Sequence, residues 1–368
     1  MKLPRFLLND WLMAYEYSTP PVRYDLAAST GLPWTVGEVL SLGNGLADFE
    51  NIVVSYTHRQ GHPVLREAIA AFHGVDPDWV VVTTGASEAM SVILCLASRP
   101  HANVVFPAPV YAAFEAMAFA WGLGAPRYPL RRDNGFKQRS ADVLEAIDDD
   151  SVLALVNTPH NPTGAVMPHS EIVSLAAELS QSGIPLVVDE VYHPLYFGAP
   201  QPSAASLDNV MVICDMSKAL SLPGLRVGWI VDANAERRGR LIDARSSFTI
   251  SNSPITEAIA AHALTHRDAL LGRFRDVATA NLSALATFMK EVDDVLSWVK
   301  PEGGSMAFPW FRDGRNSRSF CERAAEAGVL IAPGDCFGAP EHLRIGFGAR
   351  AEGFSDALTI LRRTLREG

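Results

Sequence analysis

The sequence has few cysteines, more acidic than basic residues and no long apolar run. Only four of its 368 residues are cysteines and no two of them form a CxxC pair, so we expect reduced thiols, no metal site and a cytoplasmic protein. The 31 basic residues are outnumbered by 41 acidic ones, for a formal net charge of −10. This balance argues against nucleic acid or an anionic membrane surface as a partner.

The apolar runs also argue against membrane insertion. None of them approaches the ~18–20 residues that a transmembrane helix needs. At the N-terminus, a basic start is followed by an apolar run that breaks at Asn9 and Asp10. We therefore expect no signal peptide.

The length and the order of apolar segments predict two domains of unequal size. Apolar strands alternate with amphipathic helices from residue 79 to 231, which predicts an α/β fold whose mostly parallel sheet is covered by helices. We predict an N-terminal arm over 1–45 that packs with the small domain and a large domain over 46–245. A linker helix and a small α+β domain fill 246–368.

One polar stretch lies between two apolar runs, Val210–Cys214 and Val227–Val231, which predict buried strands. Within it, Lys218 would sit at the mouth of those strands, and a lysine is rarely buried without a use. Such a lysine can lose its proton and attack a carbonyl. Arg226, beyond a Pro-Gly turn, suits a phosphate. Together they indicate pyridoxal 5′-phosphate (PLP), held as a Schiff base.

The stretch Ser217–Gly228 resembles the PLP-lysine segment of class I/II aminotransferases, which are fold type I PLP enzymes. Four other segments match that family in the same order, so the resemblance covers about residues 28–350. A looser resemblance, to the capreomycidine synthases, lies in Asp10–Leu12, around Trp34–Thr35 and in the lysine segment. These are PLP-dependent cyclases of peptide-antibiotic pathways.

The resemblance implies a phosphate cup at Gly85, Ala86 and Ser87. These small residues follow the predicted strand Trp79–Thr84 and open a helix, whose first N–H groups and positive dipole end attract phosphate. A simple helix cap at Ser87 is the alternative. In the family, an aromatic residue at the position of Tyr111 stacks on the pyridine ring of the cofactor.

Asp189 follows the apolar run Ile184–Val188, at the strand end where α/β sheets place their chemistry. The resemblance implies that its carboxylate pairs with the pyridine nitrogen and keeps that nitrogen protonated. It also implies that Asn161, in a rigid Asn-Pro-Thr-Gly turn, and Tyr192 bond the phenolic oxygen of the cofactor. Asn161 would contact the substrate as well.

Substrate contacts are implied at Arg344 and Gly31. Arg344 lies in the apolar run Leu343–Phe347, where a buried charge needs a partner, and the family uses an arginine here to grip the substrate α-carboxylate. Gly31, in the N-terminal arm, would touch substrate through its backbone, unless it belongs to a plain loop. Tyr56 would reach the cofactor phosphate of a partner subunit, which implies a homodimer with shared active sites, unless it is an ordinary aromatic.

Asp215 departs from the family pattern. Many relatives carry Ser or Thr three residues before the lysine, close to the phosphate, and a carboxylate there would repel that group. Either Asp215 turns away, or Ser217, Arg226, Ser87 and Tyr56 offset its charge. We assign the phosphate contact in this segment to Ser217.

These residues predict a PLP-dependent aminotransferase that acts on an α-amino acid and a 2-oxo acid, with Lys218 as general base and acid. A PLP enzyme with another outcome is the second hypothesis: elimination and cyclisation, oxidation or decarboxylation in a specialised biosynthetic pathway. The third is a catalytically inactive protein of this fold that serves as a regulatory or binding domain. The intact lysine, aspartate and both arginines argue against it.

Overall fold

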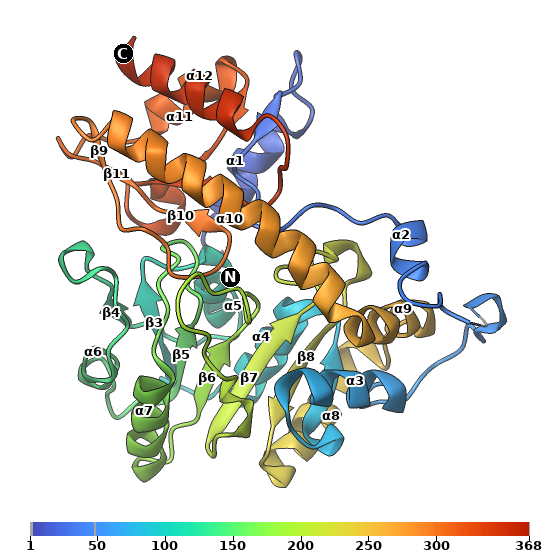
Figure 1. Ribbon diagram of the computed structural model, residues 1–368. Coiled ribbons are helices and arrows are strands. Elements are labelled where there is room, and N and C mark those ends of the chain that lie inside the picture. The colour runs from blue at the N-terminus through green and yellow to red at the C-terminus, as the bar shows by residue number, and fades with distance from the viewer. Residues whose placement is uncertain (1–2, 48, 368) are drawn as a thin grey trace.

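The computed structural model describes residues 3–47 and 49–367, and its centre is a seven-stranded sheet (Figure 1). Residues 1, 2, 48 and 368, which include the outer ends of the first and last predicted segments, lie outside the described residues. The strand order is β2-β8-β7-β6-β5-β3-β4. Within this described sheet, β8 runs opposite to the other strands. The predicted α/β fold with a mostly parallel sheet is confirmed.

Six strands of this sheet are short, mostly apolar runs, and the edge strand β4 exposes Arg127 and Pro129. The strands are β2 Val80–Thr83, β3 Asn103–Ala108, β4 Arg127–Pro129, β5 Ser151–Asn157, β6 Leu186–Asp189, β7 Val210–Asp215 and β8 Gly228–Asp232. Trp79 was predicted to open the first strand but instead ends the 3-10 helix Pro77–Trp79. The Asp76 carboxylate caps that helix, and Pro77 fits its first position.

Alternate residues of the strands point to opposite faces of the sheet. Met211 and Ile213 of β7 belong to a core shared with α4, α5 and α8. Val212 and Cys214 belong to the larger core on the other face, which includes residues of α3, α7 and α9. The helices are α3 Pro63–His73, α4 Gly85–Ala97, α5 Ala112–Ala120, α6 Ser140–Glu145, α7 His169–Gln181, α8 Ala235–Thr249 and α9 Pro254–Thr265.

A long helix, α10 (Arg267–Glu291), runs from α9 beside the large sheet to a layer of short strands (Figure 1). In that layer β14 (Leu343–Gly346) pairs antiparallel with β10 (Met306–Ala307) and β13 (Ala332–Pro333). The layer also contains β9 Leu296–Ser297, β11 Trp310–Phe311, β12 Val329–Leu330, α11 Arg318–Glu326 and α12 Phe354–Arg366. Within 3–47 and 49–367, no helix combines the length and apolar character needed to cross a bilayer.

The N-terminal arm is held by the strands of this small layer. After α1 (Leu7–Glu16), strand β1 (Tyr24–Asp25) pairs in parallel with β12. The Gly346 N–H then donates to the Leu26 carbonyl at 2.7 Å. A Cβ atom at position 346 would collide with the Ala28 carbonyl, so only glycine allows this close approach. The arm then leads to α2 (Val36–Leu40).

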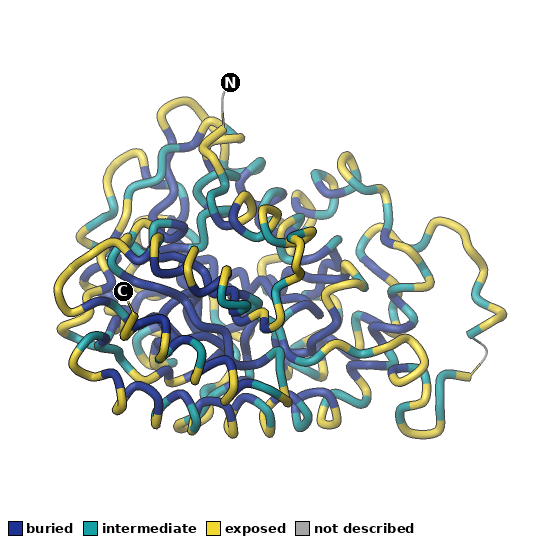
Figure 2. Tube along the Cα trace, turned by 90° about the horizontal axis from the view of Figure 1, so that it is seen from above, coloured by how far each residue is buried: buried dark blue, intermediate teal, exposed yellow. Residues whose placement is uncertain are grey.

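The segment between α2 and α3 extends away from the body of the molecule and is largely exposed (Figure 2). It carries apolar side chains into solvent, because Val53 is 77%, Val54 75% and Tyr56 79% exposed. Large apolar groups gathered on one exposed segment are typical of a surface that another protein covers.

Candidate active site

The carboxyl ends of three neighbouring strands bring the predicted site residues to one edge of the sheet. Asn157 ends β5 and pairs in register with Asp189 at the end of β6. Asp215 ends the next strand, β7, and Lys218 follows three residues later. Because these strands run parallel, their polar ends share the edge where α/β proteins bind small molecules.

Lys218 is partly buried, and its Nζ donates to Ser29 Oγ of the N-terminal arm at 3.2 Å. Burial lowers the pKa of the Lys218 ammonium, while the nearby Asp215 opposes that effect. A lysine with a lowered pKa holds part of its population as the free amine, which is the nucleophilic form. The structure therefore places a potential nucleophile where the sequence predicted one.

Asp189 is buried at the base of the same site. Its Oδ1 accepts a hydrogen bond from the Val191 N–H at 3.1 Å, and burial raises the pKa of its carboxyl to about 7. Its ionised form needs a cationic partner in this environment. Asn157 steadies the region, because its Nδ2 donates to the Asp189 carbonyl (3.2 Å) and its Oδ1 accepts from the Asn161 N–H (2.7 Å).

Aromatic residues and the arm line the rest of the site. The Tyr192 hydroxyl donates to the Ser29 carbonyl at 3.3 Å, and burial raises its pKa. Tyr111 directly precedes α5, and its ring meets Phe6 edge-on at 5.6 Å between centroids. Gly31 is buried against the loop after Lys218, where an added Cβ would collide with the Ser221 hydroxyl.

Arg344 is 2% exposed and extends from β14 toward Asn161 and the arm. Its Nη1 donates to Asn161 Oδ1 at 3.0 Å and its Nη2 to the Ala27 carbonyl at 2.7 Å. Within the described chain its Nε has no hydrogen-bond partner. Glu341, the nearest acid in sequence, pairs instead with Arg132 at 2.8 Å. Both partners of Arg344 are neutral, so a bound anion would balance its charge.

The predicted phosphate cup forms the first turn of α4. Gly85 has a φ of +78° and faces the Arg226 guanidinium, so a side chain at position 85 would meet that group. Gly228 lies against the same turn, because a Cβ there would be 2.7 Å from the Ala86 nitrogen. Ser87 is exposed at the start of the helix. Glycine at both positions thus lets Arg226 and the backbone of β8 lie close to the N–H groups that begin α4.

Asp215 does not turn away from this cup, so the first of the two alternatives that the sequence left open is wrong. Its Oδ2 accepts from the Ser217 hydroxyl at 2.7 Å and lies 3.5 Å from the Ala86 nitrogen. Arg226 approaches from the other side, with its Nη1 3.4 Å from Ser217 Oγ. Ser217, Ala86 and Arg226 are thus brought together, with a carboxylate among them.

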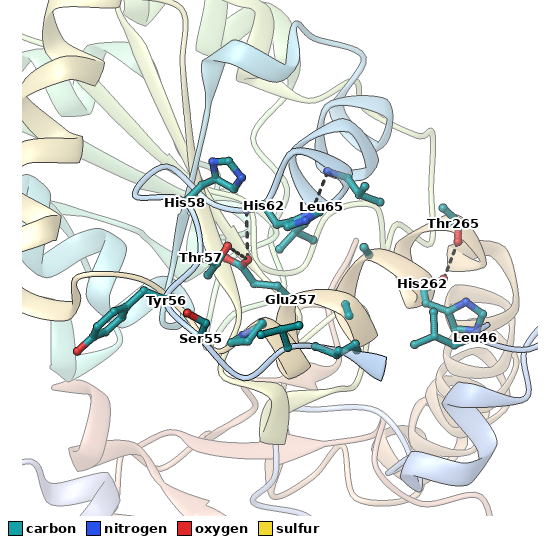
Figure 3. Close-up of a pocket in the computed structure, with 16 residues that line it drawn as sticks. Leu46, Ser55, Tyr56, Thr57, His58, His62, Leu65, Glu257, His262 and Thr265 are labelled. Atoms are coloured by element: carbon teal, nitrogen blue, oxygen red, sulfur yellow. Dashed lines mark hydrogen bonds between the residues drawn. The ribbon is translucent and has the colours of Figure 1, made fainter. Parts of the chain in front are cut away.

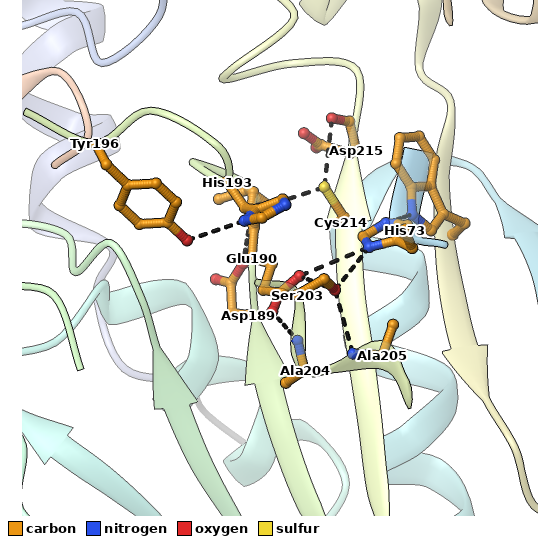
Figure 4. A network of polar contacts seen from close by, with 12 residues as sticks. His73, Asp189, Glu190, His193, Tyr196, Ser203, Ala204, Ala205, Cys214 and Asp215 are labelled. Carbon is orange, nitrogen blue, oxygen red and sulfur yellow. Dashed lines mark hydrogen bonds and ion pairs between the residues drawn. The ribbon is translucent and has the colours of Figure 1, made fainter. Parts of the chain in front are cut away.

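A buried polar chain that sequence reasoning missed lies beside Asp189 (Figure 4). Trp229 Nε1 donates to His73 Nε2 at 2.9 Å, so His73 must carry its proton on Nδ1, which faces Ser203 Oγ at 2.8 Å. Ser203 in turn donates to Glu190 Oε2 at 2.6 Å. Burial lowers the pKa of His73 to about 3 and raises that of Glu190 to about 7. These hydrogen bonds hold Glu190, the residue that directly follows Asp189, in place.

Tyr56 is a predicted site residue that the structure does not bring to the sheet edge that carries Lys218 and Asp189. It lies at one end of a pocket of about 850 Å³ between the exposed segment and α9, which Thr57, Glu257 and His262 also line (Figure 3). Conversely, sequence reasoning missed Ser29 and the Ala27 carbonyl, which contact Lys218 and Arg344. The only sequence signal for these two contacts was that Ser29 and Ala27 lie close to Gly31 in the arm.

Comparisons with known proteins identify the family. The model for aminotransferase class I and II matches residues 46–359. Capreomycidine synthase of Streptomyces vinaceus is 32% identical over 94% of this chain and 90% of its own, and valine–pyruvate aminotransferase of Mycobacterium tuberculosis is 31% identical over 96% and 94%. The chain therefore belongs to the class I and II aminotransferase family.

Solved structures agree with this assignment. A PLP-dependent aminotransferase from Streptococcus suis superimposes with a TM-score of 0.92 at 27% identity, over 100% of this chain and 99% of its own. The PLP-dependent cyclase OrfR gives 0.89 at 28% identity, over 100% and 98%. The chain thus has fold type I and uses PLP as its cofactor.

The residues of the site fit PLP. Lys218 offers an amine for the aldehyde, and Asp189 needs the positive charge that a protonated pyridine nitrogen supplies. Gly85 lets the Arg226 guanidinium lie against the first turn of α4, where a phosphate would find both a cation and N–H donors. When bound, PLP withdraws electrons from the substrate Cα and so weakens the bonds at that atom. Among the described residues, no group of three or more His, Cys, Asp or Glu is arranged to hold a metal ion.

Proposed function

We propose that this protein is an aminotransferase that moves the amino group of an α-amino acid to a 2-oxo acid, with PLP bound through Lys218. The observation that carries the proposal is Arg344: a fully buried guanidinium with only neutral partners and an unpaired Nε, aimed into the site that holds Lys218 and Asp189. A carboxylate is the anion that a guanidinium fork binds best.

In this proposal each residue has a separate task. Arg344 binds the substrate α-carboxylate and thereby orients the Cα–H bond toward Lys218, and Asn161 keeps the guanidinium in place through its Oδ1. The Lys218 amine would act as the general base that takes the proton from the substrate Cα and, once protonated, as the general acid. Asp189 keeps the pyridine nitrogen protonated, and Tyr192 and Asn161 bond the phenolic oxygen.

The proposed cofactor contacts extend to the phosphate and to the ring face. Gly85, Ala86 and Ser87 offer the N-terminal N–H groups of α4, and Ser217 and Arg226 approach from the lysine segment. Tyr111 stacks on the ring, and Gly31 closes the substrate side with its backbone.

We also infer a homodimer with shared active sites in the cytoplasm. The exposed Val53, Val54 and Tyr56 form an apolar surface suited to a second copy of the chain, which would carry Tyr56 to the partner's phosphate site. The cytoplasmic assignment rests on the thiols of Cys95, Cys214, Cys321 and Cys336, which are all free.

A second candidate function is supported by two of the comparisons. Capreomycidine synthase is the relative with 32% identity, and the neighbour OrfR is described as a cyclase. A PLP-dependent elimination and cyclisation of an amino acid would use the same Lys218, Asp189 and Arg344. Oxidation or decarboxylation would share the same cofactor site, but no observed feature favours either of them.

The test is to mix the purified holoenzyme with a panel of amino acids in the absence of a 2-oxo acid. Transamination converts the cofactor to pyridoxamine phosphate and releases one equivalent of 2-oxo acid, whereas cyclisation returns PLP and releases none. Lys218→Ala should abolish both outcomes while phosphate contacts still retain PLP. Borohydride reduction and peptide mapping check the attachment site, and a label on any other lysine would refute the proposal.

A further inference from the structure

Asp215 occupies the place where a phosphate would find its hydrogen-bond donors. It is 6% exposed, its Oδ1 accepts from the Ser217 N–H at 2.8 Å, and its Oδ2 accepts from the Ser217 hydroxyl at 2.7 Å. The same Oδ2 faces the Ala86 N–H at 3.5 Å. Ser217 and Ala86 are two of the groups assigned to the cofactor phosphate, so the carboxylate and the phosphate need the same donors.

The protein around Asp215 leaves little room for the two anions to avoid each other. Gly228 presses against the backbone of Gly85 and Ala86, so the α4 turn cannot recede. Arg226 comes close to Ser217 from one side, but it is exposed and also donates to the Pro223 carbonyl at 3.0 Å. Its charge is therefore shared with solvent and cannot fully offset a second anion in the cup.

We propose that Asp215 is an internal competitor for the phosphate group of the cofactor, so that this chain binds PLP more weakly than it would with a neutral residue at position 215. This inference rests on the proposed placement of PLP at Lys218. Before the cofactor arrives, the carboxylate accepts from Ser217 and faces the Ala86 N–H of α4. When it arrives, these donors must be released, and two anions then lie close together.

The competition acts on the phosphate alone, which separates it from a general structural role. Pyridoxal has the same aldehyde and ring as PLP but no phosphate. Asp215 also acts on the Lys218 amine, which both aldehydes would engage. Removing the negative charge at position 215 should therefore strengthen PLP binding relative to pyridoxal binding. A residue that only supported the fold would affect both ligands in the same direction.

The experiment titrates cofactor-free protein with PLP and with pyridoxal, following the absorbance of the bound aldehyde. Asp215→Ser and Asp215→Asn should each lower the Kd of PLP relative to the Kd of pyridoxal by about ten- to a hundredfold. Asp76→Ser is the matched control, since Asp76 also caps a first helical turn (2.8 Å to the Asp78 N–H) but is exposed and far from Lys218 in the sequence. Its Kd values should equal those of the wild type.

The possible results separate this inference from the proposed function. If both Asp215 variants bind PLP with the wild-type affinity or more weakly, Asp215 is no competitor, although PLP remains the cofactor. If PLP binds no protein in the series, both proposals fail. Should Asp215→Ser not fold, Asp215→Asn keeps the shape of the side chain. Its thermal stabilisation by inorganic phosphate should then exceed that of the wild type, and equal stabilisation would overturn the inference.

Discussion

Arg344 provides both a positive charge and a planar fork of hydrogen-bond donors, and a single substitution can separate the two. Arg344→Lys keeps the positive charge but loses the fork that can hold a carboxylate through two parallel bonds. We expect a loss of roughly 1.5–3 kcal/mol in transition-state binding, or about ten- to a hundredfold in kcat/KM for α-amino acids. Steady-state kinetics measure this, and amine substrates without a carboxylate should show no such loss.

The control is Arg362→Lys, which alters an exposed ion pair with Glu291 on the surface of the small layer. It should leave kcat/KM unchanged. An equal loss for amines and α-amino acids in Arg344→Lys would mean that the residue only fixes Asn161 and the arm.

Single residues also show what the sequence could predict. Lys218, Asp189 and Asn161 follow strands whose apolar pattern is visible in the sequence, so parallel pairing alone brings them to one edge. The direction of Asp215 could not be predicted, because it depends on where the Ala86 N–H lies, and Ala86 is 129 residues away. Ser29 was missed for the same reason: only tertiary packing of the arm brings it to Lys218.

At the scale of elements, the strands and helices were predictable and their junctions were less so. At one junction, α8 ends at Thr249 and Pro254 begins α9, a position in the first helical turn that suits proline. The polar chain from Trp229 to Glu190 connects β8, α3 and the 3-10 helix Ala204–Ser206 to the end of β6. None of its members has a local sequence signal, because the partners meet only in the folded chain.

Glu190 in this polar chain makes the free energy of unfolding depend on pH, and the sign of that dependence can be predicted. Burial raises the pKa of Glu190 from an ordinary 4.5 to about 7. Between these values only the folded protein keeps the proton, so the Glu190 contribution to the free energy of unfolding falls as pH rises. In Glu190→Gln this dependence is absent. The difference in unfolding free energy, wild type minus variant, should therefore fall by about 2–3 kcal/mol from pH 4.5 to pH 7.

Urea unfolding across this pH range measures that difference. Glu178→Gln on α7 is the control, because it removes an exposed carboxylate and should follow the wild-type curve. A difference between wild type and Glu190→Gln that stays constant with pH would show that Glu190 remains ionised in the fold.

At the scale of the whole molecule, the exposed apolar segment should determine the oligomeric state. Val54 is 75% exposed beside Tyr56, and burying an aspartate there in an interface would be costly. We expect the wild type to sediment as a dimer at micromolar concentration and Val54→Asp to shift toward the monomer with loss of activity. Val173→Asp, at a 42% exposed valine on α7, should remain dimeric. A monomeric wild type would contradict the shared-site proposal.

The pairing of the N-terminal arm with the last strands affects how the protein is made. The Ala27 carbonyl and Arg344 are 317 residues apart in the sequence, yet they are hydrogen-bonded in the site. A ribosome adds about 5–20 residues per second, so the arm waits roughly 15–60 s for its partners to emerge. The sheet that carries Lys218 is synthesised well before then. Cofactor binding at Lys218 can therefore precede completion of the site. In a nascent chain that stalls before β14, Arg344 has not yet been added and cannot hold the arm beside Lys218.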